Sequence, residues 1–70
     1  MKMYGKIDNY NGSYGNIIGD DGIKYILIDK DLIDDYNPSE YINQKVEFES
    51  DYVKNDEYDT YIARFVKIIK

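Results

Sequence analysis

The chain lacks the side chains on which most catalytic sites depend, because its 70 residues include neither histidine nor cysteine. Zinc sites built on thiolate or imidazole ligands are therefore excluded, together with disulfide bonds. The hydroxyl residues have no imidazole to activate them as nucleophiles. They are Ser13, Ser39, Ser50 and Thr60. The chain also has no glycine-rich loop of the kind that cradles phosphate groups.

Carboxylates are the most abundant reactive groups, and four of them lie between Asp29 and Asp35. The run partly matches a calcium-binding loop, which requires a glycine at its sixth position and an acid at its twelfth. Those positions hold Asp34 and Glu40, and Ile33 occupies a ligand position. A pair of carboxylates acting as acid and base needs a deep cleft, which a small barrel filled by its own side chains does not offer. We therefore expect no metal site, no cofactor and no enzymatic activity.

The aromatic and basic side chains point to ligand binding rather than catalysis. Nine of the eleven aromatic residues are tyrosines. Tyr10 and Tyr14, with Tyr36 or Tyr41, could stack on nucleic-acid bases; alternatively, these rings belong to the core or its rim. Five cations could contact phosphates, or could form a solvated surface of mixed charge with the acids near them. They are Lys2, Lys6, Lys24, Lys30 and Arg64.

Length and charge limit what these residues can belong to. Seventy residues are enough for one core, so we expect a single domain over 1–70. The net charge of −5 lowers the expectation of nucleic-acid binding, although a local basic surface can coexist with an acidic body. The chain contains no apolar run long enough to cross a bilayer. We expect a cytoplasmic protein without a membrane partner.

The pattern of turns and apolar residues predicts five strands. Asn11-Gly12 and Asp20-Asp21-Gly22 are hairpin signals that separate strands over 3–10, 14–19 and 23–28. A helical turn over 29–35 and a loop over 36–39 follow. A strand is expected over 44–53, because Val46 and Phe48 alternate with Lys45, Glu47 and Glu49. Residues 58–69 form a β-rich closing segment whose pattern also fits a helix. A polar loop over 54–57 connects them.

Five strands in so short a chain suit an all-β, antiparallel barrel, which removes the exposed edges of an open sheet. We expect the last two strands to pair with each other, because the apolar face of the fourth needs a closing partner. The predicted core joins one or two residues from each strand. It consists of Ile7, Ile17, Leu27, Val46, Phe48 and Val66.

Several stretches resemble the cold-shock domain, a five-stranded oligonucleotide-binding barrel (OB fold). Gly5-Lys6-Ile7 with Tyr10-Asn11 resembles its opening strand, and Tyr14-Gly15-Asn16-Ile17 its first RNA-binding signature. Lys24-Tyr25-Ile26-Leu27-Ile28 before Asp31-Leu32 is similar to the second signature. Gln44-Lys45-Val46-Glu47-Phe48-Glu49 and Ala63-Arg64-Phe65-Val66 resemble the last two strands.

The resemblance implies a module that binds single-stranded RNA or DNA weakly on one face of the sheet. The positions that correspond to the family's binding residues are Lys6, Tyr10, Tyr14, Asn16, Ile26 and Ile28. The chain departs from the family at Asp8 and Asn9, where lysine and tryptophan are expected, and Asn16, Ile26 and Ile28 replace two phenylalanines and a histidine. These departures favour an alternative, in which an acidic face binds a basic protein surface, either as an adaptor or as an inhibitor that imitates nucleic acid.

Overall fold

Two tight turns organise the first half of the chain into three antiparallel strands. The computed structural model describes residues 2–54 and 59–69. β1 spans Lys2–Tyr10, β2 spans Tyr14–Gly19 and β3 spans Lys24–Ile28. Gly12 has a φ of 101°, a conformation that favours glycine, and the Oδ1 atom of Asn11 accepts the N–H groups of Ser13 and Tyr14 at 2.9 Å. The predicted three-stranded meander is confirmed.

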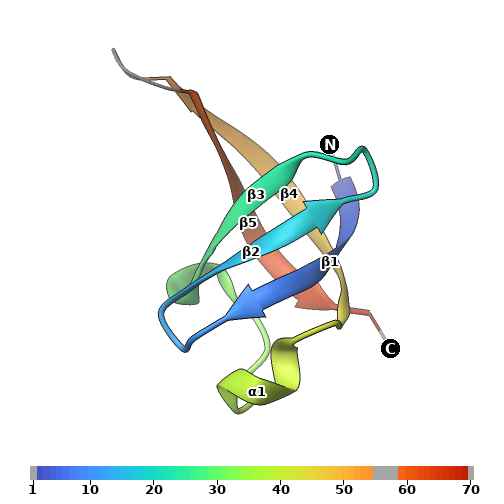
Figure 1. Cartoon of the computed structure of the whole chain (residues 1–70), viewed down its shortest axis with the longest axis vertical. Coiled ribbons are helices and arrows are strands. Elements are labelled where there is room, and N and C mark those ends of the chain that lie inside the picture. The colour runs from blue at the N-terminus through green and yellow to red at the C-terminus, as the bar shows by residue number, and fades with distance from the viewer. Residues whose placement is uncertain (1, 55–58, 70) are drawn as a thin grey trace.

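The connection from β3 to β4 contains two short helical segments. The predicted helical turn is a 3-10 turn, η1, limited to Asp29–Asp31. The predicted loop over 36–39 is wrong in its second half, because α1 spans Pro38–Tyr41. Pro38 stands in the first turn of α1, where its missing N–H leaves no helical hydrogen bond unmade. Figure 1 shows α1 beside one end of the barrel.

The second half of the chain forms the predicted pair of antiparallel strands. β4 spans Lys45–Lys54 and β5 spans Asp59–Ile68, with Val46 opposite Ile68 at one end of the register. The closing segment is therefore a strand rather than a helix. Lys54 belongs to β4, and the rest of the predicted 54–57 loop lies outside the described residues, as does position 58.

The five strands close into a barrel in the order β1-β2-β3-β5-β4, with β4 returning to pair with β1. One pairing is parallel: β3 meets β5 at Ile26 and Ile62. The predicted five-stranded barrel is confirmed, and this pairing makes its sheet mixed. Figure 1 shows the far ends of β4 and β5 extending together as an arm beyond the other strands.

The interior is filled by side chains from all five strands. All six predicted core residues, Ile7, Ile17, Leu27, Val46, Phe48 and Val66, are at most 1% exposed. The same cluster contains Tyr10, Tyr25, Tyr41, Ala63 and Ile68. The rings of Phe48 and Tyr25 meet edge to face with centroids 4.9 Å apart, so β4 contacts β3 through the core.

Two β-bulges decide which side chains point inward. In β1, Asp8 is the extra residue between the Ile7–Ile17 and Asn9–Asn16 pairs. The bulge shifts the alternation by one residue, and Tyr10 then faces inward opposite Gly15. A Cβ atom on Gly15 would overlap the backbone oxygen of Asn9, so only glycine permits this close pairing.

The second bulge lies in β5, where Phe65 and Val66 together oppose Phe48. Phe65 has a φ of 52°, which is unusual for a bulky residue, and its side chain is 68% exposed. Because of the bulge, Ala63 before it and Val66 within it both point into the core.

The buried ring of Tyr25 is anchored by the turn that precedes its strand. Its hydroxyl donates to Oδ2 of Asp21 at 2.7 Å, while Oδ1 of Asp21 accepts the N–H of Ile23 at 2.9 Å. Burial, followed by the hydrogen bond to Asp21, raises the pKa of Tyr25 to about 12.

Phe48→Ala should lower the free energy of unfolding by about 3–5 kcal/mol, because it removes a fully buried ring and leaves a cavity. A loss of that size equals most of the stability expected of a domain this small. Urea unfolding measures it, and the chain's other phenylalanine is the control. Phe65→Ala, at an exposed ring, should stay close to the wild type. Equal losses in the two variants would contradict the inward assignment of Phe48.

Tyr25 should make the fold sensitive to alkali. Its folded-state pKa of about 12 lies above the ordinary value of 10.0, so the neutral hydroxyl's stabilisation is complete below pH 10 and is lost as pH rises toward 12. Thermal midpoints from about pH 9 to about 12 should fall less in Tyr25→Phe than in the wild type. Tyr14→Phe, which removes a hydroxyl from an exposed ring, is the control. A profile for Tyr25→Phe that matches the control would sink the prediction.

Candidate functional site

The outer surface of the meander brings together most of the predicted binding residues. Residues directly opposite each other in paired strands point to the same side of a sheet. The register therefore defines the sheet face. It comprises Lys6, Asn9, Tyr14, Asn16, Ile18, Lys24, Ile26 and Ile28 of the meander, together with Ile62 of β5, which pairs with Ile26.

One end of the sheet face carries an exposed aromatic ring. Tyr14 is 65% exposed and stands opposite Ile28, which is half-buried. The turn at Asn11 fixes the start of β2, because Asn11 also donates its backbone N–H to the carbonyl oxygen of Tyr14 at 3.0 Å. This arrangement leaves a flat ring and a neighbouring apolar side chain open to solvent.

The middle of the sheet face is a row that crosses four strands. Asn9 lies opposite Asn16, which lies opposite Ile26, and Ile26 pairs with Ile62 of β5. The side-chain amide of Asn16 donates to Oδ1 of Asn9 at 3.2 Å. The row offers amide groups on β1 and β2 and an apolar surface on β3 and β5.

The other end of the sheet face is basic. Lys6 and Lys24 flank Ile18 on either side, because Ile18 is opposite both of them in the register. Both lysines are exposed, and within the described part of the chain neither takes part in a salt bridge. An anionic ligand that reaches this end would meet two unpaired ammonium groups.

Tyr10 does not join the other predicted site residues. It is 9% exposed, and its ring packs edge to face on Tyr41 with centroids 5.1 Å apart. Burial and then the charge of Asp29 raise the pKa of Tyr10 above its ordinary value. The bulge at Asp8 explains the difference, because it turns Tyr10 inward and Asn9 outward.

The two tyrosines of the β3–β4 connection are structural as well. Tyr41 is 3% exposed, and its hydroxyl donates to the backbone oxygen of Asp34 at 2.7 Å and accepts the N–H of Tyr36 at 2.9 Å. The half-buried ring of Tyr36 packs against Tyr41 with centroids 5.7 Å apart. Neither ring lies on the sheet face.

Arg64 is engaged with two acids rather than free to contact a ligand. Its Nη1 lies 3.0 Å from Asp31 and its Nε 3.3 Å from Asp51. The hydrogen bond to Asp31, and to a smaller extent that to Asp51, raises the pKa of Arg64 above its ordinary value. The pairs link η1 to the arm of β4 and β5. Lys2 is likewise paired with Glu47, at 3.7 Å.

Many of the carboxylates have structural partners too. Asp34 accepts the backbone N–H of Ile68 at 2.8 Å, and Glu40 accepts the side-chain amide of Asn37 at 3.1 Å. The other engaged acids are Asp21, Asp31, Asp51 and Glu47. The net charge of the chain therefore does not describe the sheet face, whose members include lysines but no carboxylate.

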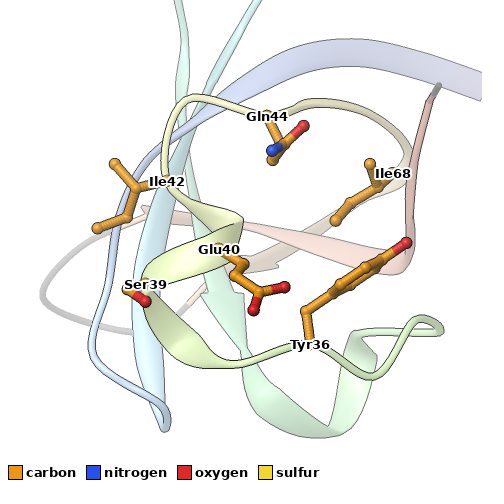
Figure 2. A pocket seen from close by; sticks show the side chains of 6 residues that line it. All are labelled: Tyr36, Ser39, Glu40, Ile42, Gln44 and Ile68. Carbon is orange, nitrogen blue, oxygen red and sulfur yellow. The ribbon is translucent and has the colours of Figure 1, made fainter.

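A separate pocket lies between α1 and the end of β5, with a volume of about 380 Å³. Its walls are Tyr36, Ser39, Glu40, Ile42, Gln44 and Ile68, and Figure 2 shows the carboxylate of Glu40 directed toward the side of Tyr36. Glu40 is the one carboxylate among these wall residues, whereas acid–base hydrolysis of the glycosidase type uses two. The pocket therefore does not supply that chemistry.

Within residues 2–54 and 59–69, no group of acidic side chains is arranged to hold a metal ion. The same residues contain no helix that is long and apolar enough to cross a membrane. The sheet face, with its exposed ring, amide row and basic end, is the surface best suited to binding.

Sequence reasoning missed Ile18 and Ile62 as members of this surface. Ile18 follows Ile17 directly, and an apolar pair gives no indication of which residue points inward. Ile62 joins the sheet face only because β5 is inserted beside β3, a pairing between residues far apart in the sequence. No local signal could have identified it.

No protein-family model matches the chain, and a search of curated proteins found no similar sequence.

Proposed function

We propose that this chain is a binding module for single-stranded RNA or DNA, which it holds across the sheet face. The observation that carries the proposal is the placement of Tyr14 on one continuous surface with Lys6 and Lys24, two lysines that form no salt bridge with the residues the structure describes. Bases stack on exposed aromatic rings without strong sequence preference, while lysines attract the phosphates. The sheet face provides both kinds of contact.

The architecture supports the same proposal. The chain forms a closed five-stranded mixed barrel with a short helix between β3 and β4. We propose that it is a cold-shock-like OB barrel, a fold whose second and third strands present a face to oligonucleotides. Tyr14 lies on β2, and Ile26 and Ile28 lie opposite Asn16 and Tyr14 on β3.

The composition of the sheet face favours weak binding and keeps a protein ligand as the alternative. Isoleucines occupy β3 positions where stacking rings would strengthen a nucleic-acid complex, and Asp8 is exposed at the bulge beside the surface. The alternative ligand is a basic protein surface, which the carboxylate of Asp8 would attract while the apolar side chains of the sheet face pack against it. Under this alternative, no oligonucleotide should bind even at low salt.

Tyr14→Ala should weaken binding of oligothymidine or oligouridine by about 1–3 kcal/mol, because it removes a stacking ring. The loss should leave the thermal midpoint nearly unchanged, since the side chain is 65% exposed. Fluorescence anisotropy of labelled oligonucleotides at about 50 mM salt measures the affinity. Tyr14→Phe keeps the ring and is the matched control. Equal affinities of Tyr14→Ala and the wild type would show that no base stacks at this position.

The double substitution Asp8→Lys with Asn9→Trp should strengthen binding. It replaces a repulsive carboxylate by a cation and adds a stacking surface beside Asn16. The same anisotropy titration measures the gain, with Asn9→Trp alone as the control for the added ring. If neither the native chain nor the double variant binds oligonucleotides at low salt, single-stranded nucleic acid is not the ligand and the protein-binding alternative is favoured.

A further inference from the structure

The basic end of the sheet face continues beyond the meander onto β4. Lys6 lies opposite Ile18 on one side and opposite Lys45 on the other, because β1 pairs with both β2 and β4. Side chains at opposed positions share a face. Lys24, Ile18, Lys6 and Lys45 therefore form one row across four strands, and three of its four members are lysines.

Lys6 and Lys45 form an unfavourable pair in the protein alone. Like charges at directly opposed positions destabilise a sheet. Both side chains are exposed, and among the described residues neither forms a salt bridge that would offset the repulsion. A bound anion between them would satisfy both ammonium groups at once.

Two hollows lie in the surface beside this pair, and we call them together the basic groove because they share two lining residues. One hollow of about 430 Å³ is lined by Tyr4, Lys6, Asp20, Lys45 and Ile69, together with the backbone around Gly5 and Val46. A second, of about 360 Å³, shares Tyr4 and Ile69 and adds Lys67 and Glu47. Tyr4 lines both hollows and is 47% exposed, so its ring is accessible to a ligand there.

We propose that this basic groove binds backbone phosphates of the same nucleic-acid strand that crosses the sheet face, with Lys6 and Lys45 contacting phosphate and Tyr4 providing a second stacking ring. The inference rests on the proposed function and extends the strand's path from β2 and β3 over β1 to β4. Lys67 stands opposite Glu47, which itself is opposite Tyr4, and so places a further cation along the path.

Two carboxylates limit the strength of this contact. Glu47 is paired with Lys2 at 3.7 Å, which offsets part of its charge. Asp20 is exposed in the wall of the larger hollow, and its backbone N–H donates to the carbonyl oxygen of Tyr4 at 2.9 Å. Replacing Asp20 by asparagine keeps this backbone bond and removes a charge that repels phosphate.

The test measures oligothymidine affinity across a salt series for the full chain. Each phosphate contact with a single strand contributes about 0.7 to the slope of log affinity against log salt. Lys45→Gln should make this slope shallower by about 0.7. The ratio of its dissociation constant to that of the wild type should therefore be largest at about 50 mM salt and fall about fivefold for each tenfold rise in salt. Asp20→Asn should tighten binding at low salt.

Lys54→Gln is the matched control, because it removes the same charge from the end of β4, where Lys54 stands opposite Asp59. Tyr14→Ala should lower affinity while keeping the wild-type salt slope, since it removes a ring and no charge. If Tyr14→Ala weakens binding but Lys45→Gln behaves like Lys54→Gln, the groove is not part of the strand's path and only this inference fails. If the wild type binds no oligonucleotide, the proposed function fails and the inference with it.

A competition experiment separates a strand path from a site for free anions. Inorganic phosphate and thymidine monophosphate should compete with oligothymidine far less effectively than an unlabelled strand at equal phosphate concentration. The inference is overturned if either small anion competes as strongly as the strand and if this competition disappears in Lys45→Gln. The groove would then be a site for small anions.

Discussion

Contact between β3 and β4 through the core is the interaction on which the rest of the structure depends. These strands are not neighbours in the sheet, because β5 lies between them. The edge-to-face packing of Phe48 on Tyr25, with centroids 4.9 Å apart, joins the meander to the second half of the barrel. This contact buries apolar surface from both halves, and without disulfide bonds the chain must rely on such burial for its stability.

The bulge in β1 determines which side chains of that strand face the core and which face the outer surface. A strand with perfect alternation would place Asn9 inward if Ile7 is inward, and Tyr10 would then be available to a ligand. The extra residue at Asp8 reverses that outcome: it contributes Tyr10 to the core and Asn9 to the sheet face. The composition of the binding surface is thus a consequence of how the interior is packed.

The positions of the charged side chains also depend on how the fold is hydrogen-bonded. Several carboxylates accept hydrogen bonds within the fold: Asp34 accepts the backbone N–H of Ile68, and Asp21 accepts the hydroxyl of Tyr25. In the part of the chain that the structure describes, the lysines of the row from Lys24 to Lys45 form no salt bridges. A chain with a net charge of −5 can therefore present a basic surface, because many of its carboxylates are committed elsewhere.

The sequence by itself determined the local elements and much of the interior. Turn residues such as Asn11-Gly12 located the hairpins, and the alternation around Val46 and Phe48 identified a half-buried strand, because both signals act between near neighbours. The positions on β2 and β3 that the cold-shock resemblance indicated, Tyr14 and Ile28 among them, also meet on one face.

The tertiary structure alone decided three further features. It placed Tyr10 inside, it inserted β5 beside β3, and it set Lys45 next to Lys6. A bulge changes the direction of side chains without changing local composition, and the pairing of β1 with β4 joins residues about forty positions apart. These three features depend on the packing of the whole closed barrel. They therefore cannot be predicted from any stretch of neighbouring residues.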